Sequence, residues 1–160
     1  MRILATFILS ASLVSTGAYA FDSEHLKQLK ETNACSKCDL SDADLSDLDL
    51  AKAKINRTNL SGANLSGANL MFANLVGSRF IGANMTEINL SAANASGANL
   101  KGANLTDAKL IRSRLRGANL AETDLTRANM KGANLSDISQ DKAIFCNTIM
   151  SDGRVERSGC

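Results

Sequence analysis

Four cysteines and one histidine are the residues of this chain with the widest chemical range. Cys35 and Cys38 form a Cys-Ser-Lys-Cys motif, whereas Cys146 and Cys160 lie near the other end of the sequence. A CxxC motif can carry out thiol–disulfide exchange or supply half of a zinc site. His25 is the only histidine, and we expect it to be a solvated residue on a short capping helix rather than a ligand.

The remaining polar residues give no pattern that is typical of an enzyme. Catalysis needs a concave site that holds acid, base or nucleophilic groups in perturbed states. The chain has no Ser-His-Asp or Cys-His arrangement and no βαβ pattern around its CxxC motif. We therefore expect no enzyme activity, no catalytic or cofactor-binding residue, no cofactor and no metal site.

The first twenty residues have the features of a secretory signal peptide. They comprise a basic Arg2, an apolar run at residues 3–14 and a small-x-small cleavage sequence at 18–20. The run is shorter than the roughly 20 residues that cross a bilayer comfortably. We expect the mature chain to begin at Phe21 and to be exported to a bacterial periplasm or exterior, where cysteines can form disulfides.

The charge composition of the chain limits the classes of partner that it can bind. Lys and Arg number 18 and Asp and Glu 16, so the formal net charge is only +2. A nucleic-acid-binding protein usually carries a larger basic excess, and a polyanion mimic is strongly acidic. We therefore expect no nucleic-acid partner. Aromatic residues make up 4% of the chain, which argues against an ordinary core built from large rings.

A five-residue repeat dominates the sequence from Leu40 to Leu135. Every fifth residue is apolar, and fifteen of these twenty positions are Leu. The residue two positions earlier is usually Ala, and the residue just before is Asn in twelve units and Asp in four. A short exact period over this length is the signature of a solenoid.

Only a chain that turns after each unit can bury this pattern. Five-residue steps on an α-helix would carry the Leu side chains around the axis, and an odd period on a flat strand would alternate faces. A turn of about 90° per unit places every Leu and Ala inside a square coil of 20 residues, stacked at about 4.8 Å. Glycines such as Gly62 and Gly97 then occupy the corners.

The segment of residues 61–70, Ser-Gly-Ala-Asn-Leu-Ser-Gly-Ala-Asn-Leu, resembles the signature of the pentapeptide-repeat family. The resemblance implies an all-β fold, a right-handed quadrilateral β-helix whose Leu and Ala positions form internal ladders. It implies little about function. The best-known members resemble DNA in shape and charge and bind DNA gyrase, and others lie in the thylakoid lumen or are exported.

The expected organisation has four parts. Residues 1–20 are the signal peptide, 21–37 an N-terminal cap with a short helix, 38–137 a solenoid of about five coils, and 138–160 a C-terminal cap. Each coil contacts only its neighbours. Both ends need caps, because exposed strand edges aggregate.

We expect the cysteines to close these caps. Cys35 and Cys38 lie in phase with the inward Leu and Ala positions, and an Asp-Gly turn at 152–153 would bring Cys146 opposite Cys160. Exported family members resemble this chain at both cysteine segments. A zinc site joining all four is ruled out by the length of the rod, about 24 Å. The sequence leaves the pairing itself open.

If every coil has 20 residues, the acidic and basic side chains fall on different sides of the solenoid. The sides centred on the Leu40 and Leu45 columns carry eight acidic residues against three basic ones, and we name these two sides the acidic half. The sides centred on the Leu50 and Ile55 columns, the basic half, carry eight basic residues against two acidic ones. The eight are Lys52, Lys54, Arg57, Lys109, Arg112, Arg114, Arg116 and Lys131.

Apolar side chains interrupt the basic half. Met71, Phe72, Val76 and Ile111 point outward where the repeat usually has Ser or Gly. These cations and apolar residues form the candidate interaction surface of a non-enzymatic scaffold, whose partner would be an unknown protein or an anionic envelope surface. Pairing of solenoid faces or ends between copies is a competing use. A gyrase-binding DNA mimic and a thiol-redox protein using Cys35 and Cys38 are the alternative functions.

Overall fold

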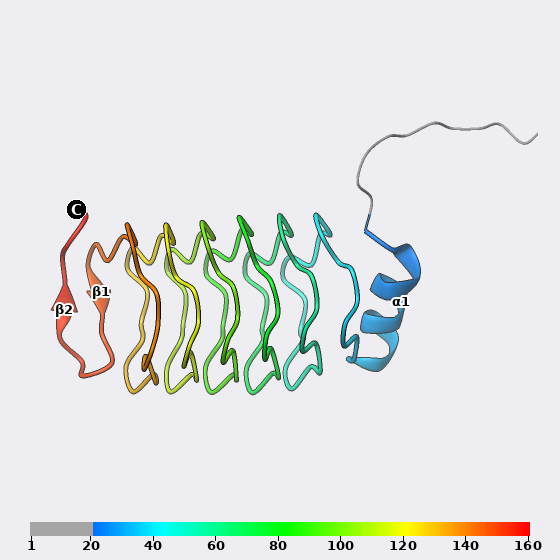
Figure 1. Ribbon diagram of the computed structural model, residues 1–160. Helices are drawn as coiled ribbons and strands as arrows, with labels where there is room; N and C mark the ends of the chain where they lie inside the picture. The colour runs from blue at the N-terminus through cyan, green and yellow to red at the C-terminus, as the bar shows by residue number, and fades with distance from the viewer. Residues whose placement is uncertain (1–20) are drawn as a thin grey trace, which may run out of the picture.

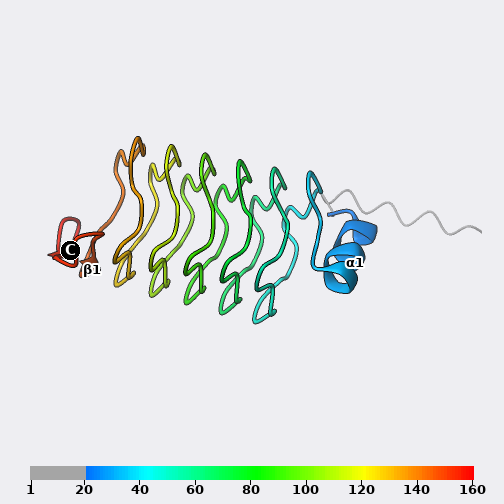
Figure 2. The ribbon, with the colours of Figure 1, turned by 90° about the horizontal axis from the view of Figure 1, so that it is seen from below.

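The structure, a computed structural model, describes residues 21–160 as one helix and a stack of coils (Figure 1). The expected signal peptide, residues 1–20, lies outside the described residues. The helix α1 spans Ser23–Thr32 and covers the first coil, while the short strands β1 (Thr148–Ile149) and β2 (Val155–Glu156) close the other end. A view from below shows the same regular stacking (Figure 2).

Each coil holds 20 residues, because every parallel bridge joins residues that lie 20 apart in the sequence, from Ala34–Lys54 to Asn129–Ile149. The unit at Leu60 shows the bonding. Its backbone N–H donates to the carbonyl of Arg79 in the next coil at 2.7 Å, and the N–H of Asn59 donates back to Cys38 at 2.9 Å. Proline would remove such donors, which explains its absence.

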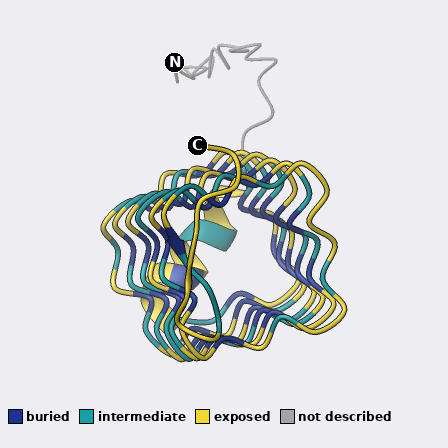
Figure 3. Ribbon diagram, turned by 90° about the vertical axis from the view of Figure 1, so that its left-hand side faces the viewer, coloured by how far each residue is buried: buried dark blue, intermediate teal, exposed yellow. Residues whose placement is uncertain are grey.

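The interior consists of two side-chain ladders. The central Leu-type positions from Leu40 to Met130 and nearly all Ala-type positions are buried, and the residues between them face outward. Viewed along its axis, the stack has a four-sided outline with exposed residues gathered at the corners (Figure 3). Exclusion of apolar side chains from water drives this arrangement.

The Asn or Asp before each Leu closes the corner. All sixteen such side chains in the repeat accept a hydrogen bond from the backbone N–H two residues later, an Asx turn. Asn59 also donates to Asp39 in the preceding coil at 3.0 Å. Beyond the Asx turn, the corner residue has positive φ, as at Gly62 (69°) and Arg112 (55°).

Buried hydroxyls replace some of the inner Ala residues. Thr58, Thr123 and Thr148 each donate to a main-chain carbonyl of the preceding coil at 2.6–2.9 Å. Ser78 bridges two such groups, because its hydroxyl donates to the carbonyl of Ile55 (2.6 Å) and accepts from the N–H of Thr58 (3.2 Å). The hydroxyl of Ser113 is buried without a partner among residues 21–160.

At the N-terminal end α1 lies across the first coil. Asp22 caps the helix by accepting from the backbone N–H of Glu24 at 2.9 Å, and Asn33 ends it in the left-handed conformation (φ 53°). Leu29 is fully buried and Leu26 partly buried against the core. The helix therefore covers the inner ladder that would otherwise meet solvent.

The C-terminal boundary differs from our expectation. The inter-coil bridges continue past residue 137 to Ile149, so the stack comprises just under six coils rather than about five. The main-chain bonds persist without the Leu signal: Leu120 still donates to Ser139 at 2.6 Å although Gln140 is exposed at a central position. Main-chain hydrogen bonds between coils do not require a Leu in each unit. The Leu pattern in the sequence therefore ends before the stack does.

The last residues form a disulfide-closed hairpin. Strand β2 pairs antiparallel with β1, Ile149 facing Val155, and Gly153 turns the chain with φ 88°. Cys146 and Cys160 are joined by a disulfide with their Cα atoms 4.7 Å apart. A loop of this length contributes about 3 kcal/mol to the free energy of unfolding in the chain-entropy model.

No helix within residues 21–160 has the length and apolar character needed to cross a membrane.

Candidate functional site

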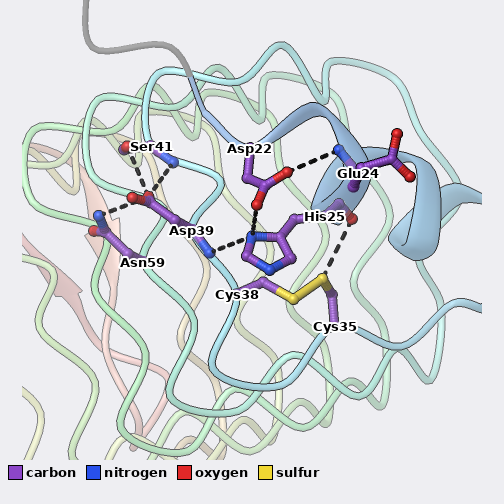
Figure 4. A network of polar contacts seen from close by, with 8 residues as sticks. All are labelled: Asp22, Glu24, His25, Cys35, Cys38, Asp39, Ser41 and Asn59. Carbon is purple, nitrogen blue, oxygen red and sulfur yellow. Dashed lines mark hydrogen bonds and ion pairs between the residues drawn. A yellow bond between two sulfur atoms is a disulfide. The ribbon is translucent and has the colours of Figure 1, made fainter.

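The chemically versatile residues of the N-terminal end form a structural joint. The Nδ1 of His25 accepts from the backbone N–H of Asp39 at 3.2 Å and lies 3.5 Å from the carboxylate of Asp22 (Figure 4). Cys35 and Cys38 are joined by a disulfide, and the Sγ of Cys35 lies 3.3 Å from the main-chain oxygen of His25. His25 is thus half-buried and ties α1 to the first coil, unlike the solvated residue we expected.

Burial disfavours a redox role for this disulfide. Cys35 is 0% exposed and Cys38 5% exposed. Thiol–disulfide exchange requires a partner thiolate to reach a sulfur atom, and redox-active cysteines are accordingly solvent-accessible. Within residues 21–160, no group of three or more His, Cys, Asp or Glu side chains is arranged to hold a metal ion. The Cys35–Cys38 pair therefore acts as a clasp beneath α1.

Acidic side chains beside this joint belong to the Asx turns. The Ser41 hydroxyl and backbone N–H hold the pKa of Asp39 below its ordinary value, and the Asn59 amide adds to the effect. Ser46 lowers the pKa of Asp44 in the same way. These two carboxylates are engaged in closing corners.

The structure exposes all eight cations that we expected on the basic half. Arg116 alone among them forms a salt bridge within residues 21–160, with Asp137 at 3.3 Å. On the acidic half the pairing differs, since Arg127 lies 2.6 Å from Asp107 and Lys101 3.4 Å from Glu122. The two halves therefore differ in unpaired charge as well as in composition.

Three of the unpaired cations replace residues that would close a corner. Lys54, Lys109 and Arg114 occupy the position before the central apolar residue, where Asn or Asp forms the Asx turn in sixteen other units. Each substitution forgoes a corner hydrogen bond and places an exposed cation on the surface. Arg79 is the corresponding case on the acidic half.

The basic half is hollowed along one edge. A groove of about 650 Å³ follows the corner between its two sides, and we name it the corner groove. It crosses successive coils, so its lining residues recur at intervals of 20. They are Met71, Phe72, Ser91, Ala92, Ile111, Arg112, Lys131, Gly132 and Ser151.

Five of the twelve surface residues expected from the sequence meet in this groove: Met71, Phe72, Ile111, Arg112 and Lys131. The other seven do not line it, and the half-buried Val76 lies one corner further along the chain from Phe72. The sequence analysis missed the floor, Ser91 and Ala92. The sequence does contain a signal for this floor. Ser91 and Ala92 are small, and they lie 20 residues after Met71 and Phe72 and 20 residues before Ile111 and Arg112.

The floor of the corner groove has no free backbone donors at its corners. The N–H groups of Phe72, Ala92 and Arg112 all donate to the next coil, at 3.1, 2.9 and 2.9 Å. Among the other lining residues, the N–H groups of Ile111 and Ser151 have no acceptor within residues 21–160. Two isolated donors that lie two coils apart do not support a further strand, because strand addition needs a row of unpaired main-chain groups. Recognition must come mainly from side chains.

A family model described as pentapeptide repeats matches this chain in three stretches, residues 35–70, 68–107 and 103–138. Together they cover well over half of the sequence. The chain belongs to the pentapeptide-repeat family. The family fold is the right-handed β-helix, in agreement with the coils described above.

Solved structures resemble this pentapeptide-repeat protein over most of its length. Rfr23, a pentapeptide-repeat protein from the cyanobacterium Cyanothece 51142, is 29% identical with a TM-score of 0.58, covering 75% of this chain and 92% of its own. HetL from Nostoc sp. strain PCC 7120, involved in heterocyst differentiation regulation, is 29% identical with a TM-score of 0.28, covering 77% and 70%.

QnrB1, a plasmid-mediated fluoroquinolone resistance protein, is 14% identical with a TM-score of 0.32, covering 69% of this chain and 80% of its own. At this identity the likeness concerns the fold alone. No curated protein matches the sequence.

Proposed function

We propose that this pentapeptide-repeat protein is a non-enzymatic, exported scaffold that docks an acidic partner on its basic half. One observation carries the proposal: seven of the eight cations on that half have no ion pair within residues 21–160, whereas two of the three on the acidic half are paired. Unpaired exposed cations on a rigid surface attract and orient an anionic partner.

The rigid coil supports this role. Each corner is fixed by main-chain bonds and usually by an Asx turn, so the cations project from a surface that loses little conformational entropy on binding. Because the surface changes little on binding, little free energy is lost in ordering it, and affinity gains even where the individual contacts are exposed and weak. The solenoid thus holds the cations at fixed positions, and the partner contributes the anionic groups that bind them.

Removal of three unpaired cations tests the proposal. Lys109→Ser, Arg112→Ser and Arg114→Ser combined should weaken binding to poly-glutamate by about 3- to 100-fold, since each exposed pair contributes roughly 0.2–1 kcal/mol. Fluorescence anisotropy at two salt concentrations measures the change, and the unaltered protein should bind more weakly at high salt. Arg116 is left in place because Asp137 already neutralises it.

The matched control removes the three cations of the acidic half, Arg79, Lys101 and Arg127, by the same substitution to Ser. Both variants lose three positive charges, so a nonspecific net-charge effect would weaken them equally. Equal loss of binding, or binding without salt dependence, contradicts docking on the basic half.

Export is the second part of the proposal. The two disulfides support it, because structural disulfides persist in oxidising compartments. Protein recovered from an envelope fraction should begin at Phe21 and show no thiol that reacts before reduction. N-terminal sequencing and thiol labelling measure both features, and a retained residue 1–20 segment or two reactive cysteines would be the opposing result.

A further inference from the structure

The corner groove combines an exposed aromatic wall, a small-residue floor and a cationic rim, and these three features together select a partner. We propose that it binds an extended acidic peptide segment that seats one large apolar side chain over Ala92. The inference rests on the proposed function, since the same cations attract the partner, and it adds the chemical class of the segment that docks.

The aromatic wall is held in place at an energetic cost. Phe72 is 58% exposed and has φ 61°, a left-handed conformation that disfavours bulky residues by about 1–2 kcal/mol. Eight other corners of the repeat carry Gly, which adopts this conformation freely, and eleven carry other residues in the same conformation. Phe72 is the one aromatic residue among them, and more than half of its surface is available for contact with another molecule.

The floor is formed by small residues. Ala92 is the only alanine at a left-handed corner between residues 21 and 160, where other coils carry Gly or a longer residue. The Cγ of Arg112 lies 3.3 Å from the place that a Cβ on Gly132 would occupy, so its stem leans over the next coil and away from Ala92. Phe72 lies one coil before Ala92 and Arg112 one coil after it, and all three line the groove.

The rim determines the charge of the partner. Arg112 and Lys131 line the groove, are exposed and form no salt bridge within residues 21–160, and the groove lining includes no acidic residue. Lys109 and Arg114 flank the same edge from its two sides. Carboxylates on the Arg112 side of the seated apolar residue would therefore meet these cations.

The length of the groove suits a short extended chain. From Met71 to Ser151 it crosses four coil spacings, about 19 Å at 4.8 Å per coil. An extended peptide of about six residues covers that distance. Since the N–H groups of Phe72, Ala92 and Arg112 are already paired, affinity must come mainly from the seated side chain and the carboxylates.

Two other occupants match the groove less well. The acidic half of a second copy offers carboxylates but a single exposed large apolar side chain within 21–160, Ile144, which stacks beside Asp124 and is 37% exposed. Ile144 packs against Gly159 of the C-terminal hairpin and is therefore a poorer match than a freely projecting side chain. An anionic bilayer would find only Phe72 projecting from this edge, and it could not reach a floor recessed between Phe72 and Arg112.

The decisive variant is Ala92→Arg, which adds a cation while filling the floor. Arg57, Arg112 and Arg127 adopt the same corner conformation, so the fold should accept it. The probe is a short fluorescein-labelled peptide that has one Leu among Glu residues. We expect Ala92→Arg to weaken its binding at least tenfold by anisotropy, although attraction by charge alone would strengthen it.

Gly82→Arg is the matched control, since it adds the same side chain at a corner of the acidic half where nothing lies within 4 Å of the new Cβ. We expect it to bind the peptide as tightly as the unaltered protein or slightly more tightly. Phe72→Ser should weaken binding of the Leu-containing peptide by several-fold. A peptide with Ser in place of Leu should bind weakly, should not respond to Phe72→Ser, and should bind to Ala92→Arg as tightly as to the unaltered protein or slightly more tightly.

Unchanged or tighter binding by Ala92→Arg would overturn the inference, as would equal binding of the Leu and Ser peptides. If poly-glutamate binding still depends on Lys109, Arg112 and Arg114 in that case, the basic half functions without the groove and the proposed function stands. If the protein binds neither peptide nor poly-glutamate, both fail. Tighter binding to phosphatidylglycerol vesicles than to the peptide, lost in Phe72→Ser, would assign the edge to a membrane surface instead.

Discussion

Phe80→Ala should lower the free energy of unfolding by about 3–5 kcal/mol, the usual cost of truncating a buried aromatic side chain. Phe80 is 1% exposed and is the largest fully buried side chain of the solenoid. Truncation removes apolar contact and leaves a cavity that backbone bonds to both neighbouring coils prevent from collapsing. Urea denaturation followed by circular dichroism measures the change.

Phe72→Ala is the matched control. It removes the same ring from a side chain that is 58% exposed, so the free energy of unfolding should change by no more than about 0.5 kcal/mol. Comparable losses in both variants would contradict the assignment of Phe80 to the core and Phe72 to the surface.

The same coil tests whether Phe80 fills space left by Ala95, the smallest central residue of the repeat, which is 4% exposed. Phe80→Leu and Ala95→Leu should each cost about 1–3 kcal/mol, and the double variant should recover part of the loss. Strict additivity would show that the two positions pack independently.

Ser78→Ala should lower the free energy of unfolding by about 1–2 kcal/mol. The hydroxyl bridges the carbonyl of Ile55 and the N–H of Thr58, and its removal breaks both hydrogen bonds. The two main-chain groups can then pair only with each other, as the N–H of Ala63 does with the carbonyl of Leu60 at 3.2 Å, so the net loss is about one hydrogen bond, roughly 0.5–1.5 kcal/mol. Thermal or urea denaturation measures the effect.

Ser113→Ala provides the comparison, because it makes the same chemical change at a buried hydroxyl that has no partner within residues 21–160. Removal of an unsatisfied polar group should leave stability unchanged or raise it by about 1 kcal/mol. A similar loss in both variants would mean that small-residue packing, rather than the hydrogen bonds of Ser78, sets the cost.

The fold was largely predictable from the sequence because the period of five admits few solutions. A Leu at every fifth position and Ala two residues earlier can both be buried only if the chain turns after each unit. The corner position was predictable from Gly62 and similar glycines, whose conformational freedom marks the bend. These features depend on local geometry that repeats identically along the chain.

Other features escaped sequence reasoning because they depend on bonds between coils. The stack continues to Ile149 after the Leu pattern fades, since main-chain pairing persists where side chains no longer report it. The role of Ser78 depends on groups about 20 residues away, and nothing in its own unit separates it from Ser113. The Asx turns explain why Asn or Asp precedes most of the central Leu residues. The sequence showed this preference but not its physical reason.

For the candidate site, the sequence alone determined which residues face outward and which half of the coil is basic, because a 20-residue period assigns every position to a side. Only the tertiary structure decided which cations are neutralised, as Arg116 is by Asp137, and where the surface is hollow. Ser91 and Ala92 became a floor only when stacking placed them between Phe72 and Arg112. A groove is a property of side chains from different coils, and their sizes and directions combine only after the chain has folded.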